Sequence, residues 1–252
     1  RTTQTIITHG CIQFKNMSAK YDINPKPVIS NLSITIKPGE KVGVIGRTGS
    51  GKSSLIKLIW RSLDYFGGEI LIDGVDIKRC DLKSLRSQMT IISQETALIE
   101  GTLRENIDLR SVDNSKDVEM EAILRRLGFN NQIYMKESLD MGIDGDGANL
   151  SAGERQLVSF ARTVLEKKPI MILDEATASI DLKTEEVIQD CLETEFKKST
   201  MLIIAHRIQT IMFCDKILIL EHGKAVAFES PADLKKNKNG YFMTILEKMK
   251  EK

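Results

Sequence analysis

The chain has 252 residues, of which 41% are hydrophobic and 28% are charged, a composition that argues against disorder and allows one large α/β domain or a core with an added lobe. Lysine and arginine (36) nearly balance aspartate and glutamate (35), so the formal net charge of +1 gives no electrostatic reason to expect nucleic acid or an anionic membrane as the main partner. No apolar run approaches the roughly 18 residues needed to cross a bilayer.

Cysteine usage and the start of the chain bear on its origin. The four cysteines show no C-x-x-C spacing and no neighbouring histidine pairs, which favours buried thiols of a cytosolic protein over disulfides or zinc ligands: Cys11, Cys80, Cys191 and Cys214. The chain begins at Arg1 without a starting methionine or a signal-like apolar segment, and this predicts a piece of a longer polypeptide.

Short apolar runs in the first ninety residues predict strands, at 34–36, 42–45, 69–72 and 90–92. Asp73 and Gly74 separate two apolar runs and predict a tight hairpin turn.

A glycine-rich stretch at 46–53 matches the pattern G-x-x-x-x-G-K-[ST], between the strand at 42–45 and a helical pattern at 53–60. Glycines allow backbone N–H groups to converge on phosphate oxygens, and a helix N-terminus adds partial positive charge. Lys52 would reach the outer phosphates, and Ser53 would ligate Mg²⁺. A glycine turn without a ligand is the alternative, but the flanking strand and helix favour a nucleoside triphosphate site.

From about residue 96 to 146 the pattern becomes helical and polar, which predicts a separate lobe. One predicted helix has an apolar face and a glycine, Gly128, placed to end it. The apolar face consists of Val118, Ala122, Ile123 and Leu127.

Residues 150–156, Leu-Ser-Ala-Gly-Glu-Arg-Gln, begin an amphipathic helix. Ser151 and Glu154 fit the S-x-x-E capping box, so a well-capped helix is a sufficient explanation when this stretch is taken alone. The apolar positions follow the spacing of one buried helical face: Leu157, Phe160, Ala161, Val164 and Leu165.

Two apolar runs, at 170–173 and 201–205, predict strands that are covered on both faces. The first is closed by Asp174 and Glu175, and the second by His206. Ligands of open α/β sheets bind at the carboxyl ends of parallel strands, where such groups suit metal orientation and water activation. A surface acidic pair and a structural histidine are the alternatives, and the shared placement beside a phosphate loop favours function.

Taken in their order along the chain, these motifs resemble those of the nucleotide-binding domain of ATP-binding cassette (ABC) transporters, and the resemblance covers essentially the whole chain. The resemblance identifies 46–53 with Walker A, 150–156 with the signature motif and 170–175 with Walker B. It also implies four single-residue roles: Tyr21 stacking on adenine, Gln94 in the Q-loop, Asp181 in the D-loop and His206 as the switch histidine.

The resemblance implies an α/β fold, with a P-loop NTPase core around a mostly parallel central sheet, an antiparallel β subdomain and an α-helical signature subdomain. We expect a single domain, 1–252. Its parts are 1–95 (β subdomain and Walker A core), 96–166 (helical subdomain with the signature) and 167–252 (Walker B, D-loop, switch histidine, C-terminal hairpin and helix).

By the same resemblance, ATP and Mg²⁺ are bound and ATP is hydrolysed. Glu175 would polarise the attacking water, while Lys52 and His206 would stabilise charge on the phosphates. The Mg²⁺ ligands would be Ser53, Gln94 and, through water, Asp174. The residues expected to hold nucleotide are Tyr21, Gly46, Arg47, Thr48, Gly49, Ser50, Gly51, Lys52, Ser53, Ser54 and Gln94.

The implied partners are a second nucleotide-binding domain, paired head-to-tail, and the transmembrane domains of the same transporter, at the cytoplasmic face of a membrane. No nucleic-acid partner is expected. The groove beside Gln94, including 96–104, would receive a membrane-domain helix. The stretches 46–54, 101–106 and 174–181 look like exporters of the multidrug-resistance-protein branch, in their second nucleotide-binding domain. The partner's ATP would meet Leu150, Ser151, Ala152, Gly153 and Glu154.

Glu154 departs from the family pattern, which usually has glutamine there. Its charge would repel phosphate across the dimer or, if the side chain points toward ribose, accept hydrogen bonds from sugar hydroxyls. We predict the ribose orientation, with the partner's ATP site weakened rather than abolished.

Three other classes compete with a transporter domain. A chromosome-maintenance or repair ATPase would need a long coiled coil between Walker A and the signature, for which there is no room and no heptad pattern. A small-molecule P-loop kinase would lack the signature and the switch histidine. A module that binds ATP only to dimerise is disfavoured by Glu175 and His206. Nothing in the chain names a transported substrate.

Overall fold

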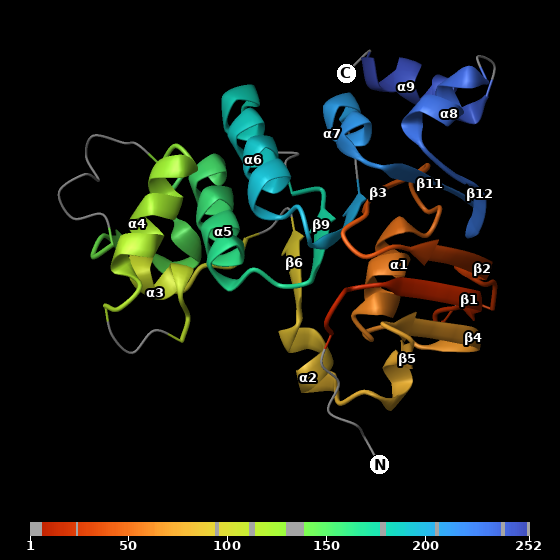
Figure 1. Cartoon of the computed structure of the whole chain (residues 1–252), viewed down its shortest axis with the longest axis horizontal. Coiled ribbons are helices and arrows are strands. Elements are labelled where there is room, and N and C mark those ends of the chain that lie inside the picture. Colours follow the sequence, from red (N-terminus) through yellow and green to blue (C-terminus); the bar gives the residue numbers. More distant parts are fainter. Residues whose placement is uncertain are drawn as a thin grey trace. The chain divides into compact units, whose positions relative to one another are not determined.

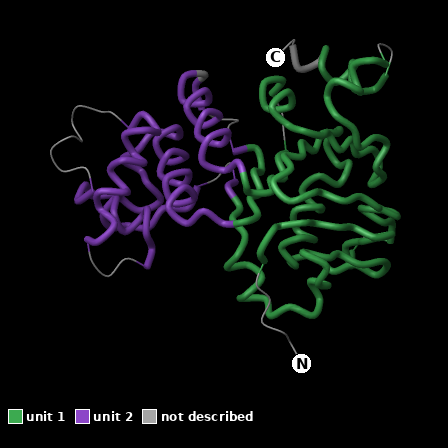
Figure 2. Tube along the Cα trace, viewed as in Figure 1, with its two compact units in different colours: residues 1–91, 169–175, 198–252 green, residues 92–168, 176–197 purple. Residues whose placement is uncertain are grey.

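The computed structural model describes residues 7–23, 25–93, 96–110, 114–129, 139–176, 180–204, 207–237 and 240–250. It has the predicted α/β fold and divides into two compact units (Figures 1 and 2). Unit 1 contains 1–91, 169–175 and 198–252, and unit 2 contains 92–168 and 176–197. Among the helices of these described ranges, none is both long and apolar enough to cross a membrane.

The first sheet of unit 1 is antiparallel, with four strands in the order β2-β1-β4-β5 (Figure 1). The predicted hairpin is confirmed, because Asp73 (φ 49°) and Gly74 (φ 81°) both have the left-handed backbone that a tight turn of this kind needs. The strands are β1 (Ile12–Ala19), β2 (Ile29–Ile36), β4 (Tyr65–Ile72) and β5 (Val75–Asp76).

The second sheet has the order β12-β11-β3-β10-β9-β6. Its four middle strands run parallel, and β12 pairs antiparallel with β11 at one edge. The predicted runs covered on both faces are confirmed, since β10 and nearly all of β9 are buried. The strands are β3 (Lys41–Ile45), β6 (Met89–Ser93), β9 (Ile170–Asp174), β10 (Thr200–Ile204), β11 (Lys216–Glu221) and β12 (Lys224–Glu229).

Helix α1 (Lys52–Ile59) belongs to one apolar core that includes residues of both sheets of unit 1. Leu55, Leu58 and Ile59 are its fully buried apolar positions. In the parallel sheet, Ile204 of β10 pairs with Val44 of β3 and with Asp174 of β9. The carboxyl ends of these three strands therefore meet at one edge. The other helices of unit 1 are α2 (Leu82–Ser87), α7 (Ile208–Phe213), α8 (Pro231–Lys236), α9 (Tyr241–Lys250) and the 3₁₀ turn at Ile77–Arg79.

Unit 2 is mostly helical, with one short antiparallel pair of strands and a 3₁₀ turn at Gly145–Gly147. It also contains residues 176–197, which the sequence analysis places in the segment 167–252 with the core. Its elements are β7 (Gly101–Thr102), α3 (Leu103–Ile107), α4 (Asp117–Arg126), β8 (Gly142–Ile143), α5 (Ala152–Glu166) and α6 (Leu182–Glu195).

The predicted apolar face of α4 is wrong in part. Val118 is 83% exposed and Ala122 is exposed, whereas Met120 and Leu124 are buried together with Ile123. The buried stripe is thus rotated around the helix, because the rest of unit 2 covers one side of it only.

Candidate functional site

The N-terminus of α1 is open, with no side chain capping it. Gly51 is the N-cap in a left-handed conformation (φ 107°), and the first turn holds no acidic residue. Five other helices have their first turn capped by side chains, from Asp81, Thr102, Ser151, Asp181 and Ser230. Helices α4 and α7 also lack a side-chain cap, but α4 has two acidic residues in its first turn. An uncapped helix N-terminus presents backbone N–H groups and partial positive charge, so it suits an anion.

Two glycines of the loop lie where a side chain would collide with neighbouring backbone. A Cβ on Gly46 would be 2.3 Å from the carbonyl oxygen of Leu220, and one on Gly51 would be 2.9 Å from that of Val28. Gly49 faces open space instead. The loop is therefore backed by protein on one side and open at its crest, as close approach of a phosphate to backbone amides requires.

Lys52 is held along this loop. Its Nζ donates hydrogen bonds to the carbonyl oxygens of Gly46 (2.8 Å) and Arg47 (3.1 Å). Burial lowers the pKa of Lys52, while the nearby charges of Glu175 and Asp174 oppose that shift. The side chain is thus folded back over the loop, where two of the loop's carbonyl oxygens fix its ammonium group.

The loop residues fit a triphosphate with Mg²⁺. The hydroxyl of Ser50 is buried, and within the described residues it has no hydrogen-bond partner. Such a group calls for an explanation, and an oxyanion at the loop would supply an acceptor. Ser53, the predicted magnesium ligand, is exposed at the start of α1.

Tyr21, the residue predicted to stack on adenine, lies next to α1. Its hydroxyl is 3.0 Å from the hydroxyl of Ser54, and the ammonium of Lys57 is 5.5 Å from the centre of its ring. The loop that follows β1 is closed by a hydrogen bond of 2.8 Å from the N–H of Val28 to the carbonyl of Ala19. The aromatic ring is thus tied to the same helix that ends the phosphate loop.

Asp174 and Glu175 end β9 at the edge where β3 and β10 also end. Glu175 has a left-handed backbone (φ 53°), a conformation that costs a non-glycine residue free energy and is concentrated at functional sites. The predicted residues Gln94 and His206 lie outside the described residues, and His206 follows two positions after the end of β10.

Unit 2 brings the signature residues and the D-loop aspartate together. The predicted capping box is confirmed: Ser151 and Glu154 cap the start of α5 reciprocally. A Cβ on Gly153 would be 4.0 Å from Oδ2 of Asp181. The Thr184 hydroxyl and N–H hold the pKa of Asp181 below its ordinary value, because they donate to its carboxylate at the start of α6.

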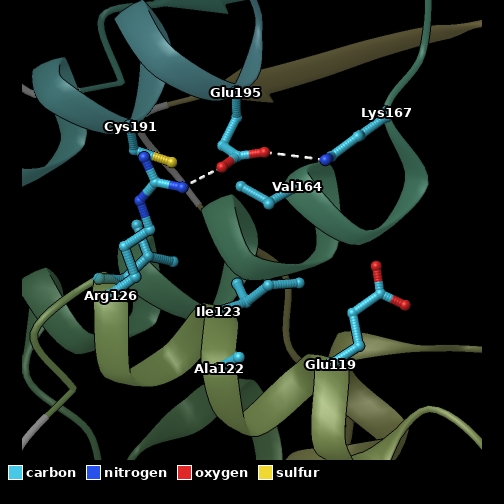
Figure 3. A pocket seen from close by; sticks show the side chains of 9 residues that line it. Glu119, Ala122, Ile123, Arg126, Val164, Lys167, Cys191 and Glu195 are labelled. Atoms are coloured by element: carbon cyan, nitrogen blue, oxygen red, sulfur yellow. Dashed lines mark hydrogen bonds and ion pairs between the residues drawn. The ribbon is translucent and has the colours of Figure 1, made fainter.

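A separate cavity of about 210 Å³ lies in unit 2, between α4, α5 and α6 (Figure 3). Glu195 bridges Arg126 and Lys167 at its rim, and these two cations hold the pKa of Glu195 below its usual range. Burial raises the pKa of the Cys191 thiol to about 11, so the thiol stays protonated. None of the predicted site residues lines this cavity.

One backbone contact of the phosphate loop was not predicted from the sequence. The backbone N–H of Gly223, in the turn between β11 and β12, donates a hydrogen bond of 3.0 Å to the carbonyl of Ser50. The turn itself is readable in the sequence at 221–223, but the pairing of β11 with β3 that brings it to the loop is not.

Similar proteins identify the family. A model of the ABC transporter family matches residues 29–178. The chain is 41% identical to bile pigment transporter 1 of Saccharomyces cerevisiae over 95% of this chain and 16% of that protein. It is 41% identical to ATP-binding cassette sub-family C member 2 of Rattus norvegicus over 95% of this chain and 15% of that protein. The chain thus spans about a sixth of the length of these relatives.

A solved structure, of a bacterial Atm1-family ABC exporter with ATP bound, is similar with a TM-score of 0.87 and 30% identity over 97% of this chain and 42% of that one. The chain belongs to the ABC transporter family and corresponds to its nucleotide-binding domain.

Proposed function

We propose that ATP binding and hydrolysis by this chain drive the export of a substrate through transmembrane domains of a longer protein. The observation that carries the proposal is the uncapped N-terminus of α1, with Lys52 folded over the loop and two carboxylates at the same edge of the sheet. These groups form a site for a triphosphate and for the water that attacks it.

ATP would bind with its phosphates on residues 46–54 and its adenine on Tyr21. The loop amides and the Lys52 ammonium would hold the β and γ phosphates, since fixed donors and a positive charge stabilise phosphate oxygens. Tyr21 would stack its aromatic ring on the adenine base.

Mg²⁺ would be held by Ser53, Gln94 and Asp174, the last through water, together with phosphate oxygens. Hydroxyl, amide and carboxylate oxygens are the ligands that this cation prefers. When bound, it would neutralise charge on the phosphates.

Hydrolysis would depend on Glu175 and His206. The Glu175 carboxylate would orient and polarise a water molecule for attack on the γ-phosphate, and His206 would stabilise the charge that develops there. The left-handed backbone of Glu175 supports this role, because it turns the residue out of the strand direction at the end of β9.

A second nucleotide-binding domain, from the same or a homologous chain, would complete each site. Ser151 and Gly153 of its signature would face the γ-phosphate, and Asp181 would lie beside them. The capping box supports this arrangement, since the Ser151 oxygen accepts within the cap while its hydrogen remains available to a phosphate.

One relative is named as a transporter and the similar solved structure as an exporter, and on that ground we place the domain at the cytoplasmic face of a membrane. Movement of unit 2 segments that follow Gln94, including 96–104, would transmit ATP turnover to the transmembrane domains. Its place as the second nucleotide-binding domain of the transporter stays a prediction.

Light scattering tests the pairing. Glu175→Gln, with ATP and without Mg²⁺, should form a pair alone or with the other nucleotide-binding domain of its transporter. Lys52→Ala should stay monomeric under the same conditions. A Glu175→Gln protein that binds ATP but stays monomeric, both alone and with the other nucleotide-binding domain, would refute the paired mechanism.

A further inference from the structure

We propose that Gly223, in the turn between β11 and β12, is a positioning residue for ATP. It holds the phosphate loop and the start of β2 in one fixed arrangement, and the start of β2 closes the loop that carries Tyr21. This inference rests on the proposed role of residues 46–54 as the ATP site.

The first argument is hydrogen bonding. The N–H of Gly223 donates to the carbonyl of Ser50 at 3.0 Å, and the carbonyl of Gly223 accepts from the N–H of Ser30 at 2.8 Å. Gly223 therefore bonds to the phosphate loop through its N–H and to β2 through its carbonyl oxygen. All three residues belong to unit 1.

The second argument is steric. Gly223 has a φ of +76°, and a Cβ there would be 2.4 Å from the carbonyl oxygen of Val28 and 3.2 Å from Cα of Ile29. A Cβ on Gly51 would be 2.6 Å from Cδ1 of Ile29 and 2.9 Å from the carbonyl oxygen of Val28. The start of β2 thus packs against both glycines, with no room for a methyl group at either.

The start of β2 beside Gly223 is also connected to Tyr21, the proposed adenine-binding residue. The N–H of Val28 donates to the carbonyl of Ala19, and this bond closes the loop in which Tyr21 lies. Displacement of Val28 would therefore move the end of that loop, while α1 keeps its bond to the Tyr21 hydroxyl through Ser54. Gly223 would thus fix the distance between Tyr21, which is proposed to bind adenine, and the phosphate loop, without contacting ATP itself.

Gly223→Ala tests the proposal, with Gly74→Ala as its matched control. Gly74 also lies in a hairpin turn with a left-handed backbone (φ +81°), but a Cβ there would meet no atom within 4 Å. Affinity for ATP and for inorganic triphosphate is measured by calorimetry on each protein, and thermal unfolding is measured without nucleotide.

We expect Gly223→Ala to weaken ATP binding by about tenfold, the effect of losing about one net hydrogen bond. It should also lower the ratio of ATP affinity to triphosphate affinity, because the adenine site and the phosphate site would no longer be spaced to fit one ATP molecule. Gly74→Ala should keep the parental ratio. A merely structural role would lower stability and both affinities together and would leave the ratio unchanged, which would overturn the proposal.

A combination with Tyr21→Ala sharpens the result. If Gly223→Ala has already lost the contact between Tyr21 and adenine, adding Tyr21→Ala should lower ATP affinity less in that variant than in the parent chain, since the effects of coupled residues are non-additive. Full additivity of the two changes would contradict the coupling.

Hydrogen exchange on the unaltered chain gives a second test that does not depend on folding of a variant. ATP should slow exchange at the amides of Ser30 and Gly223. Unchanged exchange at both, with ATP bound, would overturn the inference. If the parent binds neither ATP nor triphosphate, the proposed function itself fails. If the parent binds both ligands but Gly223→Ala keeps the parental ratio of ATP affinity to triphosphate affinity, only this inference fails.

Discussion

Glu154 accepts a hydrogen bond of 2.8 Å from the backbone N–H of Ser151, and its own N–H donates to the Ser151 hydroxyl at 3.2 Å. A glutamine at this position completes the same capping box. The structural contribution of the side chain can therefore be separated from its charge by one substitution. The ribose orientation of Glu154 stays a prediction.

Glu154→Gln should tighten ATP-driven pairing by about two- to fivefold, because an exposed charge near phosphate is worth roughly 0.2–1 kcal/mol. Its unfolding free energy should change by only a few tenths of a kcal/mol, with the cap preserved. Ser151→Ala, which removes the hydroxyl of the cap, should instead lower the unfolding free energy by about 1 kcal/mol. Pairing and turnover that remain parental in Glu154→Gln would exclude a role for the charge.

Tyr21→Ala should weaken ATP binding by roughly 1–3 kcal/mol, the value of one base stacked on an aromatic ring. Tyr21→Phe keeps the ring and loses only the contact with Ser54, so its affinity should stay near the parental value. Fluorescence titration with ATP and with inorganic triphosphate separates the two effects. Equal losses for both ligands in Tyr21→Ala would count against stacking.

Asp73 clamps the N-terminal segment and makes stability depend on pH. Burial alone would raise the pKa of Asp73, but four backbone N–H donors outweigh it and hold the pKa below its ordinary value. The contribution to stability is thus complete above the unfolded pKa of about 4 and is lost as pH falls through the lower folded pKa. The donors are Thr8, His9, Gly10 and Cys11.

Asp73→Asn should lower the unfolding free energy at pH 7 by roughly 1–2 kcal/mol, after allowance for solvent screening. Urea denaturation at pH 7 and at pH 3 measures the difference from the parent, which should shrink at the lower pH. Asp64→Asn, at an exposed position, is the control. A difference that is equal at both values of pH would contradict the clamp.

Glu175→Gln should keep ATP affinity within about twofold and slow phosphate release by at least a hundredfold, because the amide cannot polarise water as a carboxylate does. Single-turnover release from the assembled transporter measures it. Glu186→Gln, on the exposed side of α6, is the control. Parental turnover in Glu175→Gln would exclude this residue as the group that activates water.

Local patterns in the sequence predicted many elements, but not the helices α2, α6 and α7. Strand β1 was also missed. Its apolar positions alternate at Ile12 and Phe14 and then shift to Met17 and Ala19. The register shifts between Phe14 and Met17, and Asn16 has a left-handed backbone there. A bulge breaks the two-residue period on which recognition of a strand depends.

Motif order predicted the site residues, whereas their support depends on contacts between distant segments. The loop at 46–54 carries its own signal, since glycine and lysine spacing is local. The burial of the Ser50 hydroxyl, and the hydrogen bond from the Gly223 N–H to the Ser50 carbonyl, arise only when β11 pairs with β3. Such pairings join residues more than 150 positions apart, and no local pattern encodes them.

ATP binding to Lys52→Ala tests the central claim most directly. Calorimetric titration compares the parent, Lys52→Ala and Lys83→Ala, an exposed lysine of α2. We predict parental affinity in Lys83→Ala and a loss of about ten- to hundredfold in Lys52→Ala, because a hydrogen bond to a charged group is worth roughly 1.5–3 kcal/mol. Parental affinity in Lys52→Ala would show that ATP does not bind at this loop.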